Sequence, residues 1–198
     1  MIKAILFDFG GVLAELRGEA HILGLIGDRM TRAEMWHHWS HSPAVRAHET
    51  GAIDAVEFSQ RIVKELALPT TPAQFQVDFA NWIVGPFAET ASLIRTCAAR
   101  YQTALLTNIS AHHWPVVESL DILPHMHHVH ASFKVGSLKP DPIYFESALA
   151  RVGCAADEAI FFDDSPVNVA GATALGITAV RVNSAAEVQH ALLARGLL

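Results

Sequence analysis

Four short, uninterrupted apolar runs are the feature that most constrains the fold of this chain of 198 residues. Runs of this length and composition are typical of strands that are buried on both faces of a parallel sheet. Helix-like segments separate the later runs, and this alternation of strand and helix predicts an α/β fold with a parallel, doubly wound sheet. The runs are Ala4–Phe7, Thr103–Leu106, Ala159–Phe162 and Ile177–Val180, and a weaker fifth candidate is His128–Ser132.

The stretch between the first two runs has a different character. Residues 14–87 contain helix signals in succession and no convincing strand, which predicts an all-helical insertion. The rest of the chain, residues 1–13 and 88–198, would then form one core domain. Capping patterns mark several helix starts, both in the insertion and in the core: Thr31 with Glu34, Asp54 with Glu57, Thr71-Pro72 with Gln74, Asp141-Pro142, and Ser184 with Glu187.

The charge and the apolar runs of the chain exclude two classes of binding partner, nucleic acids and membranes. The net charge of −6 leaves no basic patch for a phosphate backbone, so we expect no nucleic-acid partner. No apolar run approaches the roughly 18 residues of a membrane span, so we expect no membrane partner. Cys97 and Cys154 are widely spaced, and the apolar amino end meets Asp8 too early for a secretory signal. These features favour a cytoplasmic protein, and they leave its oligomeric state open.

Polar residues follow the predicted strands where each strand ends. Asp8 follows the first run, Thr107-Asn108 the second, and Asp163-Asp164 the run at Ala159–Phe162. Ligands of doubly wound sheets bind beyond the carboxyl ends of the strands, so these residues should meet at one edge. Three converging carboxylates repel one another unless a cation lies between them, and oxygen ligands suit Mg²⁺. The sequence therefore predicts a magnesium site.

The same residues match the needs of phosphoryl transfer. A carboxylate can act as a nucleophile, a metal ion and a lysine can neutralise the phosphoryl oxygens, and hydroxyl and amide groups can orient them. Lys139 of Lys139-Pro140, in the loop before a predicted helix, supplies the lysine. Each fragment alone is weakly specific, whereas the ordered set of four is strong.

This ordered set resembles the four motifs of the haloacid dehalogenase (HAD) superfamily. The motifs are Phe7-Asp8-Phe9-Gly10-Gly11-Val12-Leu13, Leu106-Thr107-Asn108, Lys139-Pro140 and Phe162-Asp163-Asp164. With Asn168, Gly171 and Gly176 downstream, the resemblance covers essentially the whole core. It implies a five-stranded, Rossmann-like core under a mobile helical cap, and His48-Glu49-Thr50-Gly51-Ala52-Ile53 resembles the turn between two cap helices.

The resemblance also implies a role for each motif residue. Asp8 would be the nucleophile that becomes an aspartyl-phosphate, and Lys139 would neutralise charge on Asp8 and on the phosphoryl group. Thr107 and Asn108 would bind that group. The Mg²⁺ ligands would be Asp8, the Gly10 carbonyl and the Asp163-Asp164 pair, without indication of which of the pair binds directly.

One position departs from the commonest family pattern. Most phosphatases of the superfamily carry a second aspartate two residues after the nucleophile, as general acid and base, and this chain has Gly10 there. An Asp-x-Gly-x-Val branch exists that includes glucose-1-phosphate phosphatase-like proteins, which this chain resembles most. A replacement acid could come from several residues, although a solvated surface position is the simpler interpretation of each: Glu15, His21, His37, His38, His41, His48 and Glu49.

Together these features predict a Mg²⁺-dependent phosphatase that acts on a small phosphorylated metabolite, with a sugar phosphate as the favoured substrate. The main alternative is a non-catalytic module that binds Mg²⁺ and phosphate but has lost turnover through Gly10. A metal-free haloacid dehalogenase is less favoured, because it would not need the Asp163-Asp164 pair for a cation.

Overall fold

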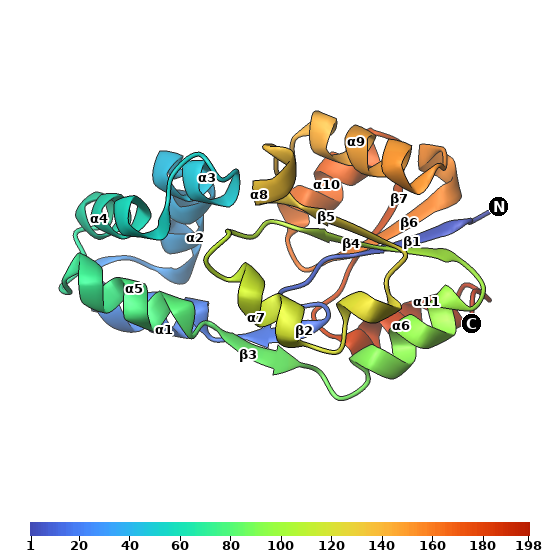
Figure 1. The fold of residues 1–198 in the computed structure, drawn as a ribbon, viewed down its shortest axis with the longest axis horizontal. Helices are drawn as coiled ribbons and strands as arrows, with labels where there is room; N and C mark the ends of the chain where they lie inside the picture. Colours follow the sequence, from blue (N-terminus) through green and yellow to red (C-terminus); the bar gives the residue numbers. More distant parts are fainter.

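The centre of the molecule is a five-stranded, entirely parallel sheet with the order β5-β4-β1-β6-β7 (Figure 1). The computed structural model describes residues 1–198. The five strands coincide with the five predicted apolar runs to within one or two residues, so the predicted doubly wound sheet is confirmed. They are β1 (Ala4–Phe7), β4 (Gln102–Thr107), β5 (His128–Ala131), β6 (Ala159–Asp163) and β7 (Thr178–Arg181).

Helices cover both faces of this sheet, because alternate side chains of each strand point to opposite faces. Ile5 and Phe7 of β1 belong to one apolar cluster, whereas Ala4 and Leu6 belong to another. The first cluster includes side chains of α6 (Thr90–Ala98), α7 (Trp114–Ser119) and α11 (Ala185–Leu193). The second includes side chains of α9 (Pro142–Val152) and α10 (Pro166–Ala174). The short helix α8 (Ser132–Val135) follows β5 directly.

A separate group of helices lies beyond one end of the sheet, on the left in Figure 1. It has its own apolar cluster, in which Phe58, Ile62 and Phe75 are buried. The side chains of Thr31, Asp54 and Thr71 cap three of its helices, as predicted. We call residues 18–80 the helical segment; it comprises α1 (Gly18–Ile26), a 3-10 turn (Gly27–Arg29), α2 (Arg32–His41), α3 (Pro43–Glu49), α4 (Ala55–Glu65) and α5 (Pro72–Ala80).

Two short strands connect the helical segment to the core, and they correct the prediction of no strand within residues 14–87. β2 (Ala14–Leu16) pairs antiparallel with β3 (Ile83–Pro86). Three or four residues are too few to show a period of two, and the two partners are far apart in the sequence. Next to these strands, Gly18 at the start of α1 packs against Trp82, which precedes β3. A Cβ on Gly18 would lie 2.2 Å from the Trp82 ring, so only glycine fits there.

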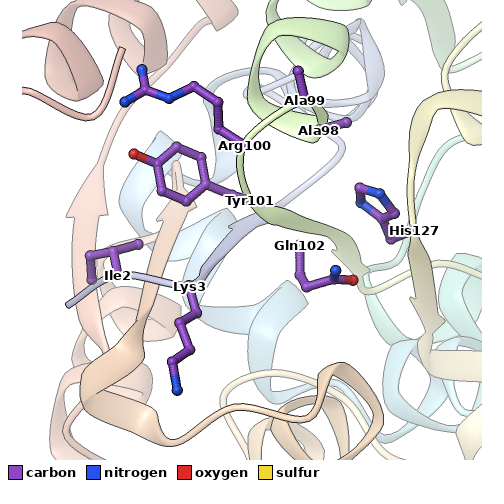
Figure 2. A pocket seen from close by; sticks show the side chains of 8 residues that line it. All are labelled: Ile2, Lys3, Ala98, Ala99, Arg100, Tyr101, Gln102 and His127. Carbon is purple, nitrogen blue, oxygen red and sulfur yellow. The ribbon is translucent and has the colours of Figure 1, made fainter.

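A shallow pocket of about 390 Å³ lies at the amino-terminal edge of the sheet (Figure 2). Lys3 and Gln102, which stand at the starts of β1 and β4, line it together with Arg100 and Tyr101. The predicted site residues Asp8 and Thr107 stand at the opposite ends of the same two strands. This pocket is therefore not the predicted site. None of the helices combines the length and the apolar character that crossing a membrane requires.

Candidate active site

Four charged residues predicted for the site meet at the carboxyl edge of the sheet. Asp8 directly follows β1, Asp163 ends β6, and Asp164 comes next. One carboxylate oxygen from each of these three residues lies within 4.8 Å of the others. Lys139 reaches them from the loop before α9, and its Nζ donates to Asp8 Oδ1 at 2.6 Å and to Asp163 Oδ2 at 2.7 Å. Strand order thus brings together residues up to 156 positions apart.

Lys139 is only 2% exposed, and its charge is held by its neighbours. Burial lowers the pKa of Lys139, but the charges of Asp163 and Asp8 outweigh burial and raise that pKa above its usual value. The ammonium group therefore stays protonated at any physiological pH. An ion pair this deep needs both of its partners, because either one alone would be an uncompensated buried charge.

Asn108 fixes the backbone of Lys139. Its Oδ1 accepts from the Lys139 amide at 2.8 Å, and its Nδ2 donates to the Lys139 carbonyl at 2.9 Å. These bonds commit Oδ1 and one Nδ2 hydrogen to the main chain and leave the second Nδ2 hydrogen free, so the predicted contact of Asn108 with a phosphoryl group stays a prediction. The neighbouring Thr107 is buried, and its hydroxyl forms no hydrogen bond within the protein.

The two acids of the Asp163-Asp164 pair have different surroundings. Asp163 is fully buried and accepts bonds from Lys139 Nζ, from the Ser165 amide at 2.8 Å and from Asn168 Nδ2 at 3.0 and 3.2 Å. The Asp164 carboxylate accepts no side-chain hydrogen bond. It lies so close to Gly11 that a Cβ there would be 2.7 Å from Asp164 Oδ2, and Gly11 has a φ of +73°.

The crowding of acids changes their protonation. Burial, the largest cause, raises the pKa of Asp8; the charge of Lys139 opposes this, and the charges of Asp163 and Asp164 add to it. Burial and the charge of Asp163 also raise the pKa of Asp164, to about 6. Three carboxylates share one ammonium group, so the site has excess negative charge unless a cation or protons enter it.

Gly10 has no side chain, and the space that its Cβ would enter is occupied. A Cβ built there would lie 2.4 Å from Leu16 Cδ1, on the first strand of the connection to the helical segment. The same strand carries Glu15, which is exposed. A carboxylate on residue 10 would thus require Leu16 to turn away.

Most of the residues that could replace a general acid at position 10 lie away from the site. Glu49, at the carboxyl end of α3, is the exception. His37, His38 and His41 are exposed on α2. Glu49 is the last residue of α3, and the charge of Lys139 lowers its pKa while burial, the larger cause, raises that pKa to about 7. The remaining two are held elsewhere: His21 accepts from Trp82 Nε1 at 3.1 Å, and His48 stacks on Phe58.

Sequence reasoning missed Ser132, which joins the helical segment to the core. Its buried hydroxyl accepts from the Ile109 amide at 2.9 Å and donates to the Glu49 carbonyl at 2.6 Å. The position of Ser132 could have indicated it, because Ser132 stands at the carboxyl end of the fifth predicted strand. On the other strands, the residues at this end were predicted to form the site. Nothing in the sequence indicates its partner Glu49, which is 83 positions away.

The family of the chain follows from a match to a family model. The model for "haloacid dehalogenase-like hydrolase" matches residues 2–176. This chain belongs to the HAD-like hydrolases. The resemblance of the four motifs is thereby confirmed, and the protein is an enzyme of the hydrolase class.

Solved structures of other HAD-like proteins share the fold over most of both chains. A predicted HAD-like family hydrolase from Porphyromonas gingivalis is 25% identical, with 92% of each chain covered and a TM-score of 0.72. A HAD family enzyme from Bacteroides thetaiotaomicron, solved in complex with magnesium and inorganic phosphate, is 22% identical, with 91% of this chain and 94% of that chain covered and a TM-score of 0.70. The L-2-haloacid dehalogenase from Xanthobacter autotrophicus is 19% identical, with 92% and 78% covered and a TM-score of 0.65.

Proposed function

We propose that this HAD-like hydrolase is a Mg²⁺-dependent phosphatase that acts on a small phosphorylated metabolite, with sugar phosphates as the favoured class. The observation that carries the proposal is the buried ammonium group of Lys139 between Asp8 and Asp163, with Asp164 beside them. A nucleophilic carboxylate next to a fixed cation suits attack on an anionic phosphoryl group. The magnesium and phosphate in the Bacteroides enzyme support this choice of ligands.

The residues of the site fit a magnesium ion. All available donors are oxygens, and the oxygens of three carboxylates lie within 4.8 Å of one another, as a hard cation requires. Asp8, the Gly10 carbonyl and Asp164 would be the direct ligands, because the oxygens of Asp163 are already engaged by Lys139, Ser165 and Asn168. Bound Mg²⁺ would neutralise the charge of the phosphoryl oxygens.

The chain's own groups account for the rest of the displacement. An oxygen of Asp8 attacks phosphorus, the bond from phosphorus to the leaving oxygen breaks, and an aspartyl-phosphate forms on Asp8. Lys139 holds Asp8 in place, and its charge favours the ionised form of Asp8 against the effect of burial. The free hydroxyl of Thr107 and the second Nδ2 hydrogen of Asn108 donate to the phosphoryl oxygens. Hydrolysis of the aspartyl-phosphate then releases inorganic phosphate and restores Asp8.

The insertion of residues 14–87 acts in this proposal as a cap over the site. Support comes from its separate apolar cluster and from the pairing of β2 with β3, the strands through which the chain enters and leaves it. Its side chains would meet the part of the substrate beyond the phosphoryl group and would exclude water.

The test is phosphate release from a panel of sugar phosphates, nucleotides and an aryl phosphate, with and without Mg²⁺, for the wild type and for Asp8→Asn. We expect release that needs both Mg²⁺ and Asp8. If the wild type releases no phosphate but still binds Mg²⁺, the protein is a non-catalytic module. Metal-independent halide release from a 2-haloacid would instead establish a dehalogenase.

A further inference from the structure

The proposed phosphatase reaction requires a proton donor and then a base, and the residue two positions after the nucleophile cannot supply either. An alkoxide leaving group must take up a proton, and the water that hydrolyses the aspartyl-phosphate must lose one. Gly10 has no titratable group, and Leu16 fills the space where one would project. The inference below rests on the proposed function and concerns which residue takes over this task.

Three contacts attach the carboxyl end of α3, where Glu49 lies, to core residues beside the site. The Glu49 carbonyl accepts from Ser132, whose hydroxyl also holds Ile109, the residue after Asn108. Two positions later, a Cβ on Gly51 would be 2.9 Å from the carbonyl oxygen of Phe133 in α8, so the turn after α3 packs directly on that helix.

The third contact lies one turn earlier on α3. Arg46 pairs through both its terminal nitrogens with the carboxylate of Asp141, two residues after Lys139. The end of α3 is therefore attached both to the loop that carries Lys139 and to the residues that follow Asn108. This docking fixes the position of Glu49 relative to Asp8, which Lys139 contacts.

The side chain of Glu49, unlike its backbone, is uncommitted. Its carboxyl group forms no hydrogen bond or ion pair, although it is only partly accessible and close enough to Lys139 for that charge to act on it. Burial raises the pKa of Glu49 to about 7, so that both protonation states are populated near neutral pH. A group that must donate a proton in one step and accept one in the next needs this balance.

The other charged groups around the end of α3 have partners of their own. Arg46 is paired with Asp141, and Lys134 of α8 lies over the Trp114 ring at 4.1 Å. His48 stacks on Phe58 and directs Nδ1 to the Ile53 carbonyl at 3.3 Å. Lys139 is the one charge near Glu49 that also contacts the nucleophile.

We propose that Glu49 is the general acid and base of this enzyme, supplied by the helical segment in place of the residue missing at Gly10. In the first step Asp8 attacks phosphorus, the bond to the leaving oxygen breaks, and protonated Glu49 passes its proton to that oxygen, which leaves as an alcohol. In the second step water attacks phosphorus, ionised Glu49 takes a proton from the water, and the bond to Asp8 breaks. The products are inorganic phosphate, free Asp8 and protonated Glu49.

The test compares Glu49→Gln with the wild type on two substrates, a sugar phosphate and an aryl phosphate. Glutamine keeps the shape of the side chain, and no hydrogen bond is lost. On the sugar phosphate we expect kcat to fall by about 10²–10⁴-fold with little change in KM. An aryl leaving group needs no proton, so the variant should release one equivalent of phenolate in a burst and then turn over slowly, because hydrolysis of the aspartyl-phosphate lacks its base.

The pH profile and a second carboxylate complete the test. For the wild type, kcat/KM on the sugar phosphate should fall as pH rises above about 7, where Glu49 loses its proton, and Glu49→Gln should lack this limb. Glu15→Gln, which changes an exposed carboxylate on β2, should behave as the wild type in every assay.

Equal losses on both substrates without a burst, or no loss at all, would overturn the assignment of Glu49 while leaving the phosphatase itself established. Absence of phosphate release by the wild type would overturn the phosphatase first. Far-ultraviolet circular dichroism of each variant distinguishes both results from misfolding.

Discussion

The two sides of the site differ in how completely their polar groups are bonded. On the core side, Lys139, Asp163 and Asn108 hold one another in a closed network of hydrogen bonds and ion pairs. On the side of the helical segment, the Glu49 carboxyl and the buried Nε2 of His48 have no partner. The core side is thus organised before a substrate arrives, as electrostatic stabilisation requires. The opposite side is held by the Glu49 carbonyl and by the pair of Arg46 with Asp141, which leaves the Glu49 carboxyl group free for the leaving group.

The largest effect should follow from breaking the closed network. Lys139→Ala leaves Asp8 and Asp163 without their shared cation, so we expect kcat to fall by at least about 10²–10³-fold. Removal of one partner from a buried ion pair also costs about 3–5 kcal/mol in the free energy of unfolding. Kinetics and urea unfolding measure both losses.

The control for this variant is Lys134→Ala, which removes a lysine that stacks on Trp114 and pairs with no acid. We expect a stability loss of about 1 kcal/mol or less and an unchanged kcat. Comparable losses of kcat and stability in the two variants would show that the hydrogen bonds and ion pairs of Lys139 contribute no more than an exposed lysine does.

A smaller effect should appear in the binding of Mg²⁺. Since the pKa of Asp164 is raised to about 6, protons compete with the ion below that pH. The apparent affinity should therefore increase with pH above 5, by about tenfold per unit for each proton displaced, and level off only above about 8, where Asp8 is ionised as well. Titration calorimetry at several pH values measures this. Asp164→Asn should bind Mg²⁺ more weakly and with a flatter pH profile, and an unchanged profile would remove Asp164 from the ligand set.

The comparison also explains which parts of the molecule the sequence could predict. The strands end at or next to three of the predicted site residues, Asp8, Thr107 and Asp163. A parallel sheet brings these ends together independently of the conformation of the loops. Asp141 was predicted only as a helix start, and its carboxylate pairs with Arg46 instead of capping α9. That contact, like the bond from Ser132 to Glu49, depends on how the helical segment docks. Docking leaves no periodic pattern in the sequence.

The next prediction concerns the attachment of Glu49. Ser132→Ala removes a fully buried hydroxyl that satisfies both the Ile109 amide and the Glu49 carbonyl. Leaving these groups unpaired costs about 1–3 kcal/mol in stability. Turnover of a sugar phosphate should fall by up to about tenfold, and the first step on an aryl phosphate should fall less, because the attachment positions the proton donor.

Ser147→Ala is the matched control, because Ser147 bonds to His130 and to the Tyr144 carbonyl within the core. It should leave the ratio of sugar phosphate to aryl phosphate activity unchanged. An equal change in that ratio for both serine variants would mean that the attachment of Glu49 has no part in leaving-group protonation.

The smallest effect should come from the ion pair between Arg46 and Asp141, whose side chains are 55% and 28% exposed. Exposed pairs contribute about 1 kcal/mol or less, so Arg46→Ala should reduce sugar phosphate turnover by no more than about fivefold. High salt should weaken the wild type in the same direction, because it screens exposed charges. Arg61→Ala is the control, since Arg61 pairs with Glu57 inside α4 and joins nothing to the core. If the two arginine variants have the same kinetics, Ser132 and the turn at Gly51 suffice to hold Glu49 in place.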